Sequence, residues 1–313
     1  MIKNIKINMS NLAPIILFCY NRPWHVEQTL IALSKNELAD QSVLYIYCDG
    51  PKENAAEELI EKIKEVRSVV RKEQWCKEVY IIESEKNKGL ADSIISGVTD
   101  VVNKHGRVIV LEDDIITSKG FLQYMNDALE IYADESSVMH ISAYMYPHKC
   151  NLPSTFFYQV PYPGGGWATW KRAWDLYNNN TEELYNNWKD RWEEFDWFGG
   201  DYLSKQLIDN YKGTLKTWFI KWHAVLLQQH ALTLYPGNSL TNNIGFDDLG
   251  TNCYTTDKFD VSIVDKVVVE KNPIKINKKA SRIIYDFYQG HWYNKRRRKA
   301  LFNKIINLLQ FWK

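Results

Sequence analysis

Three consecutive carboxylates, Glu112, Asp113 and Asp114, follow an apolar run at residues 108–111. Acidic side chains this close together repel one another unless a cation or hydrogen-bond donors compensate their charge. A divalent metal is the simplest compensation, because carboxylate oxygens suit Mg²⁺ or Mn²⁺, and such an ion bridges phosphates rather than occupying an all-protein cage. A solvated acidic turn that caps the following helix explains the same tripeptide. The motif alone does not decide between the two.

Charged residues follow three earlier apolar runs as well. They are Arg22, Asp49 and Lys88, which come after the runs at 14–20, 43–48 and 79–82. In an open parallel sheet the carboxyl ends of neighbouring strands meet at one edge, where ligands bind. Two cations at that edge suit a diphosphate, and Asp49 suits the base or ribose of a nucleotide. Each residue taken singly is more often a helix cap or a surface charge, but their joint placement favours a ligand site.

The hydrophobic pattern predicts the elements that position these residues. The four apolar runs are short and rich in β-branched and aromatic residues, as buried parallel strands require. Between them, helical patterns occupy three segments, at 23–33, 54–71 and 91–103. This alternation predicts an α/β fold with a Rossmann-like, mostly parallel and doubly wound sheet.

Length and composition are those of an ordinary globular protein. The 313 residues are 45% hydrophobic and 25% charged, so the chain can bury a large core. Because no internal repeat or low-complexity linker divides it, we expect one domain at 1–270, with a nucleotide-binding half at 13–115 and a second half at 116–270. The five cysteines lie far apart without a CxxC pair, which argues against disulfides and structural zinc and favours a reducing compartment.

The sequence contains no membrane-spanning pattern, since no stretch approaches roughly eighteen apolar residues. The apolar run at 13–20 is too short for a signal peptide, so we expect a cytoplasmic protein. Its net charge of +1 is unevenly distributed. Residues 271–313 contain twelve Lys or Arg and one acidic residue, a charge of +11, which leaves −10 on residues 1–270. The basic end therefore suits an anionic partner.

The end of the chain predicts a basic amphipathic helix. KRRRK at 295–299 precedes a segment in which Leu301, Ile305 and Leu308 fall on one stripe. This pattern is typical of a helix lying in a membrane interface, so we expect peripheral association with the anionic inner face of the cell membrane. A terminal helix packed on the domain explains it too. We expect no nucleic-acid partner, because the rest of the chain is acidic.

A glycine-rich segment, GGGWATW at 164–170, is a further candidate ligand contact. Three glycines allow the backbone to approach a ligand, and the rings of Trp167 and Trp170 offer flat apolar faces to a sugar. A glycine-rich turn followed by core tryptophans accounts for the same residues.

Six motifs occur in one order along residues 13–255: PIILFCYNRP, CDGPKEN, NKGLADSIISGV, VIVLEDDI, GGGWATWKRAW and LYPGNSLTNNIGFD. Together they resemble a bacterial family of GT-A glycosyltransferases found with surface-polysaccharide genes, such as those for capsule or O-antigen. The acidic tripeptide at 112–114 also resembles the metal motif of the animal N-acetylglucosaminyltransferase that initiates complex N-glycans. The resemblance implies a GT-A fold and a hexosyl- or N-acetylhexosaminyltransferase whose second half, 116–270, binds the acceptor.

The resemblance also implies a role for individual residues. Asp114 would bind Mn²⁺ or Mg²⁺ directly, and the metal would offset the charge that develops on the departing nucleoside diphosphate. The other implied contacts are with the donor: Arg22 with the diphosphate or base, Asp49 with the base edge, Lys88, Gly89 and Asp92 with the nucleotide, Glu112 and Asp113 with the sugar and ribose, and Gly166 and Trp167 with the donor sugar.

An inverting transfer needs a carboxylate that takes a proton from the acceptor hydroxyl. Some relatives carry an aspartate directly after the tryptophan of the segment matching TWFIKW, where this chain has Phe219. Phenylalanine cannot act as a base, so another acid serves or the mechanism departs from inversion. Asp201 and Asp247 are the candidates, although a cap or a turn explains each of them too. Three further acids stay open: Asp248, Asp196 and Glu194.

The sequence therefore predicts a metal-dependent glycosyltransferase, and the resemblance alone favours an inverting one. Its donor would be a nucleotide sugar, UDP-hexose or UDP-N-acetylhexosamine, and its acceptor a lipid-linked or growing polysaccharide. A sugar-nucleotidyltransferase is an alternative, but it would have a glycine-rich, basic loop after the first strand, which Asn21-Arg22-Pro23 is not. A non-catalytic glycan- or membrane-binding module would explain the tryptophans and the tail, yet it would leave the acidic tripeptide unexplained.

Overall fold

A mixed eight-stranded sheet forms the centre of the computed structural model, which describes residues 12–196, 201–247 and 255–289. In spatial order its strands are β3 (Glu78–Glu83), β2 (Val43–Cys48), β1 (Ile15–Cys19), β4 (Arg107–Glu112), β8 (Trp167–Trp170), β6 (Val138–Ser142), β9 (Leu232–Pro236) and β7 (Thr155–Tyr158). A separate two-stranded sheet pairs β5 (Ile115–Thr117) with β10 (Thr241–Asn243).

Most strands of the central sheet run in one direction. β3, β2, β1 and β4 are parallel neighbours, and β6 is parallel to β9. β8 runs antiparallel between β4 and β6, and β7 is antiparallel to β9. The predicted α/β class with a mostly parallel sheet is confirmed.

The helices lie between the strands along the chain. They are α1 (Pro23–Ser34), the 3₁₀ turn η2 (Ala39–Gln41), α2 (Glu57–Val69), α3 (Leu90–His105), α4 (Phe121–Ile131), α5 (Lys171–Trp174), α6 (Thr181–Trp188), α7 (Trp192–Phe195), α8 (Tyr202–Tyr211) and α9 (Phe219–Gln228). A further helix occupies residues 278–289, at the end of the last described segment.

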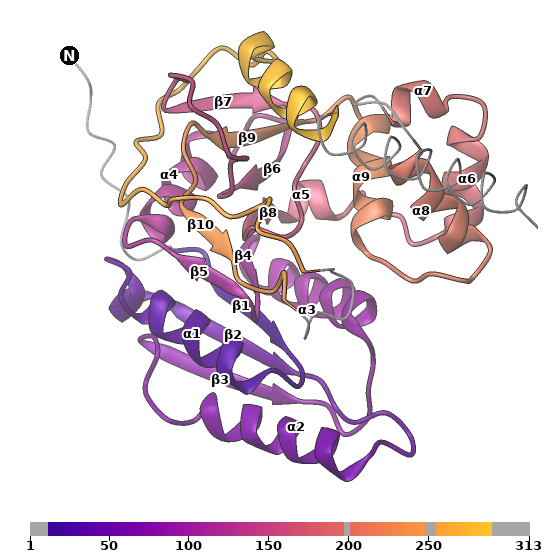
Figure 1. Cartoon of the computed structure of the whole chain (residues 1–313). Coiled ribbons are helices and arrows are strands. Elements are labelled where there is room, and N and C mark those ends of the chain that lie inside the picture. Colours follow the sequence, from indigo (N-terminus) through magenta and orange to yellow (C-terminus); the bar gives the residue numbers. More distant parts are fainter. Residues whose placement is uncertain (1–11, 197–200, 248–254, 290–313) are drawn as a thin grey trace, which may run out of the picture.

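Helices cover both faces of the sheet, since successive residues of a strand point to opposite sides. Leu17 of β1 belongs to a core that includes apolar residues of α1, α2 and α4. Its neighbours Ile16 and Phe18 belong to a second core, which includes α3 and α9. Figure 1 shows α1 and α2 on the near side of β1 to β3. The sheet is therefore doubly wound, as the sequence predicts.

Helices α6, α7, α8 and α9 form a lobe beside the sheet (Figure 1). α6 packs on both α8 and α9, and α7 packs on α8. Their buried side chains, among them Trp188, Phe195, Leu207 and Trp222, join the core on the α3 face of the sheet. This helical lobe is why the tryptophan-rich part of the sequence is largely buried.

Residues 255–289 cross back over the molecule and pack on the far edge of the sheet. Ile276 forms an isolated β-bridge with Phe157 of β7. Ala280 and Ile284 are buried in a third core, which is rich in tyrosines. Part of the predicted basic tail thus packs on the domain, whereas the KRRRK segment and the amphipathic pattern after it lie outside the described residues. No helix within the described ranges is long and apolar enough to cross a membrane.

Candidate active site

The ends of β1 and β4 bring an arginine between two carboxylates. These strands are paired, with Phe18 opposite Glu112, so the loops that follow them emerge side by side. The Arg22 guanidinium donates to the carboxylate of Asp113, and its Nη2 lies 2.8 Å from Oδ2 of Asp114. Arg22, expected to contact a ligand diphosphate, here compensates the acidic tripeptide from within the protein.

One guanidinium does not neutralise three carboxylates. Burial, and then the negative charges of Asp114 and Asp113, raise the pKa of Glu112 to about 8, although Arg22 opposes this shift. Burial also raises the pKa of Asp113 to about 6, and Arg22 again opposes it. Both shifts mean that this edge of the sheet lacks positive charge, which makes it favourable to a further cation.

A distant segment closes over the same edge through the small sheet. β10 pairs antiparallel with β5, which places Asn243 opposite Ile115. The backbone N–H of Ile244 donates to the carbonyl of Asp114, and Nδ2 of Asn243 lies 3.4 Å from Asp114 Oδ1. Gly245 lies so close that a Cβ there would overlap the Asp114 carboxylate, which explains the glycine.

Asp247 and His25 complete this cluster. Nε2 of His25 lies 3.0 Å from Oδ2 of Asp247; the histidine side chain is 2% exposed and the aspartate side chain 38%. The structure thus brings Asp247 to the site, as one of the two base candidates. His25 and Asn243 were not predicted, although His25 follows Arg22 by one helical turn and Asn243 lies in the motif that contains Asp247.

Asp49, which was expected to contact the base of the nucleotide, already accepts four hydrogen bonds from the protein. Oδ1 accepts from the backbone N–H groups of Gly50 and Lys88, both at 2.9 Å. Oδ2 accepts from Asn87 Nδ2 at 2.9 Å and from the Gly89 N–H at 3.0 Å. A carboxylate has about four lone-pair sites, so Asp49 holds the turn before α3 in place.

The turn before α3 contains Lys88 and Gly89, which the resemblance implies are nucleotide contacts. Lys88 is exposed, and Gly89 has a φ of 79°, which favours glycine. Asp92, in the first turn of α3, pairs with Lys216 at 2.5 Å and so links α3 to the segment before α9.

The glycine-rich loop lies against the cluster through its backbone. The carbonyl of Gly164 accepts from Asn243 Nδ2 at 2.9 Å, and that of Gly165 accepts from Thr241 Oγ1 at 2.5 Å. Gly166 has a φ of 73°, and a Cβ there would press on Leu111 and Phe121. The loop therefore borders the acidic site.

Trp167 is a correction to the sequence analysis, because its ring is buried rather than open to a sugar. It is 1% exposed and stacks on Trp218 at 4.9 Å and on His140 at 5.2 Å, measured between ring centroids. His140 of β6 and Trp218, which precedes α9, stack on the ring, so the protein already covers it. Trp170 is also buried and donates from Nε1 to the carbonyl of Leu129.

Three of the remaining candidate bases lie away from the cluster. Asp201 is exposed and immediately precedes α8 in the helical lobe. Asp196 accepts the N–H groups of Leu203 and Ser204, and Glu194 pairs with Arg191. Asp248 lies outside the described residues.

The fit of a divalent metal depends on how many ligands the protein must supply. No group of three His, Cys, Asp or Glu side chains is arranged to hold a metal ion in the part of the chain that the structure describes. Mg²⁺ usually binds through one or two carboxylates, several waters and substrate phosphates. Asp114, in an edge with excess negative charge, fits an ion of that kind, which arrives with a phosphorylated ligand.

Comparisons with known proteins give the fold context. The chain matches no known family model and no curated protein sequence. Its structure is similar to the mannosyltransferase PcManGT from Pyrobaculum calidifontis in complex with GDP-Man and Mn²⁺, with 13% identity, a TM-score of 0.37 and coverage of 56% of this chain and 46% of that one. It is also similar to S. aureus TarS 1-349, with 12% identity, a TM-score of 0.34 and coverage of 56% and 48%.

A third similar structure is CMP:2-keto-3-deoxy-manno-octonic acid synthetase complexed with CTP, with 11% identity, a TM-score of 0.32 and coverage of 57% of this chain and 84% of that one. The chain spans about half the length of the mannosyltransferase and TarS chains. These similarities carry no argument about activity, so the case for a function depends on the site itself.

Proposed function

We propose that this chain is a glycosyltransferase that moves a sugar from a nucleoside diphosphate donor, UDP-hexose or UDP-N-acetylhexosamine, to a lipid-linked or growing glycan. One observation carries the proposal. Three consecutive carboxylates, one guanidinium and an aspartate from a distant segment meet at the carboxyl ends of β1 and β4, the edge at which α/β sheets bind ligands.

The charge balance of this edge suits a metal-bound diphosphate. Asp114 would hold Mn²⁺ or Mg²⁺, and the ion, when bound, offsets negative charge on the departing diphosphate. Arg22 fixes the orientation of Asp113 and Asp114 through its two ion pairs. Lys88 is exposed on the turn that Asp49 holds, so its ammonium group is free to approach a phosphate.

Asp247 is the general base that we favour. It lies in the cluster, its side chain is 38% exposed, and Nε2 of the buried His25 lies 3.0 Å from one of its oxygens. The carboxylate can therefore take a proton from an acceptor hydroxyl that approaches from solvent, as an inverting transfer requires. Asp201 has no comparable place, because it begins a helix in the lobe beside the sheet.

Two other classes make different demands on the same edge. A sugar-nucleotidyltransferase would bind a nucleoside triphosphate, and a glycan- or membrane-binding module would bind no nucleotide.

The proposal also includes the basic end of the chain, which would anchor the protein at the anionic inner face of the cell membrane.

Calorimetric titration of the full chain separates these classes. Titrations with UDP, with and without Mn²⁺, and with UTP and CTP would be compared under one buffer and salt condition. The proposal predicts Mn²⁺-dependent binding of UDP. Tighter binding of a nucleoside triphosphate would favour the nucleotidyltransferase, and no binding of any nucleotide would favour the module.

A further inference from the structure

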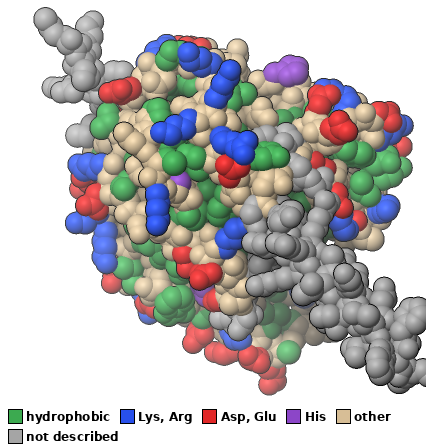
Figure 2. Space-filling model, turned by 45° about the horizontal axis from the view of Figure 1, so that its top comes forward, with side chains coloured by type: hydrophobic (Ala, Val, Ile, Leu, Met, Phe, Trp, Pro, Cys, Tyr) green, Lys and Arg blue, Asp and Glu red, His purple; other side chains and the backbone are tan. Residues whose placement is uncertain are grey.

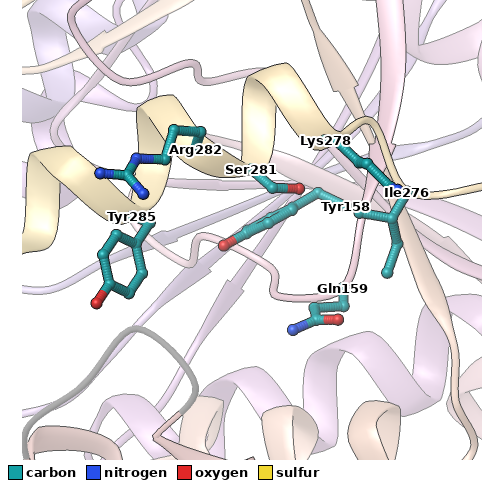
Figure 3. A pocket seen from close by; sticks show the side chains of 7 residues that line it. All are labelled: Tyr158, Gln159, Ile276, Lys278, Ser281, Arg282 and Tyr285. Carbon is teal, nitrogen blue, oxygen red and sulfur yellow. The ribbon is translucent and has the colours of Figure 1, made fainter.

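A pocket of about 370 Å³ lies between the end of β7 and the helix at 278–289. This volume is at the lower end of the range of about 300–1,000 Å³ for small-ligand sites. Its lining consists of Tyr158, Gln159, Ile276, Lys278, Ser281, Arg282 and Tyr285. Figure 3 shows Arg282 and Tyr285 on the helix, with Tyr158 beside them and Gln159 lower in the view, at the end of β7.

The pocket is separate from the candidate active site. β7 is four positions from β4 in the central sheet, which corresponds to about 19 Å at the usual strand spacing. β7 also runs antiparallel to β9, with Tyr158 opposite Thr233. Tyr158 therefore lies toward the end of the sheet opposite to Glu112, and a ligand in this pocket would not touch Arg22 or Asp114.

The helix places its lining residues on one face. Lys278, Arg282 and Tyr285 are spaced by four and three residues, so they lie one above another along about two turns. Arg282 lies over the ring of Tyr285, with its guanidinium carbon 5.6 Å from the ring centroid. Ser281 is on the same side and keeps its hydroxyl on the carbonyl of Asn277.

Charge favours an anion in this pocket. Arg282 pairs with Asp286, one turn further along the same helix face, whereas Lys278 has no hydrogen bond or ion pair with any described residue. The stretch at 271–282 contains five Lys or Arg and no acidic residue. Figure 2 shows Lys and Arg side chains over the upper and left parts of this face, with acidic ones among them and a further acidic group at its lower edge.

The side-chain types specify the ligand further. The ring of Tyr285, which is partly exposed, offers an apolar face to the C–H groups of a sugar ring, whereas Tyr158 is 1% exposed and only backs the pocket. The Gln159 amide can both donate to and accept from sugar hydroxyls, and the two cations pair with a carboxylate or a phosphate. We propose that this pocket binds a pyranose ring that carries a negative charge, as a uronate or a sugar phosphate, apart from the reaction site.

Its position suggests a docking site for a charged glycan. The same helix carries Phe287 and Tyr288 into the aromatic core, where Phe287 packs on Phe259 and Phe259 stacks on Phe246, the neighbour of Asp247. Arg282 and Tyr288 are about 9 Å apart along the helix axis. The pocket thus lies on a helix that Phe259 connects to the loop of the proposed base. The inference does not depend on glycosyl transfer, since binding is measured without a donor.

Saturation-transfer NMR and calorimetry on the full chain test this site. The probes are glucuronate and glucose 1-phosphate, with neutral glucose and inorganic phosphate as comparisons. We expect both anionic sugars to bind, with glucose and phosphate each weaker by about tenfold, because each lacks one of the two recognised features. Equal binding of glucose, equal binding of phosphate, or no saturable binding of either anionic sugar would overturn the proposal.

Variants locate the site on the molecule. We expect Tyr285→Ala and the double change Lys278→Gln with Arg282→Gln each to weaken glucuronate binding by about tenfold. Lys279→Gln is the matched control, because Lys279 is exposed on the same helix and bonds to the Asn151 carbonyl instead of lining the pocket. Circular dichroism checks that each variant is folded. Unchanged affinity in both pocket variants, an equal loss in the control, or displacement of glucuronate by UDP would contradict the assignment.

Discussion

Two regions of this molecule bury polar groups in opposite ways. At the ends of β1 and β4, Arg22, Asp113 and Asp114 form ion pairs, and the nearby Asp247 keeps part of its side chain in solvent. On the α3 face of the sheet, His140 and His223 are buried among aromatic rings, here called the aromatic layer, and neither forms an ion pair with another described residue. The comparison teaches that the charged edge can exchange partners with a ligand, whereas the aromatic layer only packs.

The largest expected effect concerns the two candidate bases. Asp247→Asn should lower the rate of sugar transfer by about 100-fold or more, since general base catalysis contributes about 10² to 10⁴. Asp201→Asn is its matched control and should leave the rate unchanged, because Asp201 is in the helical lobe. The measurement is nucleotide release with a donor found by screening nucleotide sugars. Normal turnover in the Asp247 variant would remove it from the mechanism.

Removal of the guanidinium tests the ion pairs of the edge. Arg22→Gln should lower the free energy of unfolding by about 3–5 kcal/mol at neutral pH, because two largely buried carboxylates lose their cation. Arg71→Gln is the control: Arg71 also pairs with a carboxylate, Glu83, but is half exposed, and its loss should cost less than about 1 kcal/mol. Urea unfolding measures both. If both variants lost the same free energy of unfolding, burial would not strengthen the ion pairs of Arg22 relative to the exposed pair of Arg71.

The histidines of the aromatic layer predict a pH dependence. Burial lowers the pKa of His223 to about 4, below the ordinary value of 6.5. The unfolded chain then binds a proton that the folded chain does not, so the contribution of His223 to the free energy of unfolding falls as the pH drops from about 6.5 toward 4. At pH 5 this loss amounts to about 2 kcal/mol relative to pH 7.

His223→Leu should remove this contribution. Urea unfolding of the variant and of the native chain at pH 5, 6 and 7 measures the difference in their free energies of unfolding. His230→Asn is the control, because His230 is exposed and has a φ of 50°, a conformation that asparagine tolerates. If the His223 variant kept the full slope, another group would be responsible.

The smallest effect separates two tryptophans of β8. Trp167→Phe should destabilise the fold by about 1 kcal/mol, since its Nε1 has no hydrogen-bond partner among the described residues. Trp170→Phe should cost more, because it leaves the Leu129 carbonyl without its donor. Neither change should alter UDP affinity. A loss of affinity in the Trp167 variant without a loss of stability would restore the predicted contact with the donor sugar.

The sequence predicts the strands and the charged edge well for one physical reason. Buried parallel strands are apolar throughout, so the predicted run at 43–48 coincides with β2 and the run at 108–111 lies within β4. Parallel strands then bring the residues after them to one edge, which is why Arg22 and the acidic tripeptide meet.

Partners were harder to predict than positions. A cluster of carboxylates requires compensation, but its sequence does not state whether the protein or a ligand supplies the cation, and Arg22 supplies part of it here. Burial of Trp167 depends on the helical lobe that packs over β8, which a local pattern does not reveal. The contact between His25 and Asp247 joins segments more than 200 residues apart, so no spacing could indicate it.

The central claim is that the acidic edge binds a metal-bound nucleoside diphosphate through Asp114. Its most direct test is calorimetric titration of UDP into the full chain and into Asp114→Asn, each with and without Mn²⁺. We expect Mn²⁺ to strengthen UDP binding to the native chain and to have no effect on the variant, with both proteins equally folded by circular dichroism. An Mn²⁺ effect of the same size in the variant, or none in the native chain, would contradict the account.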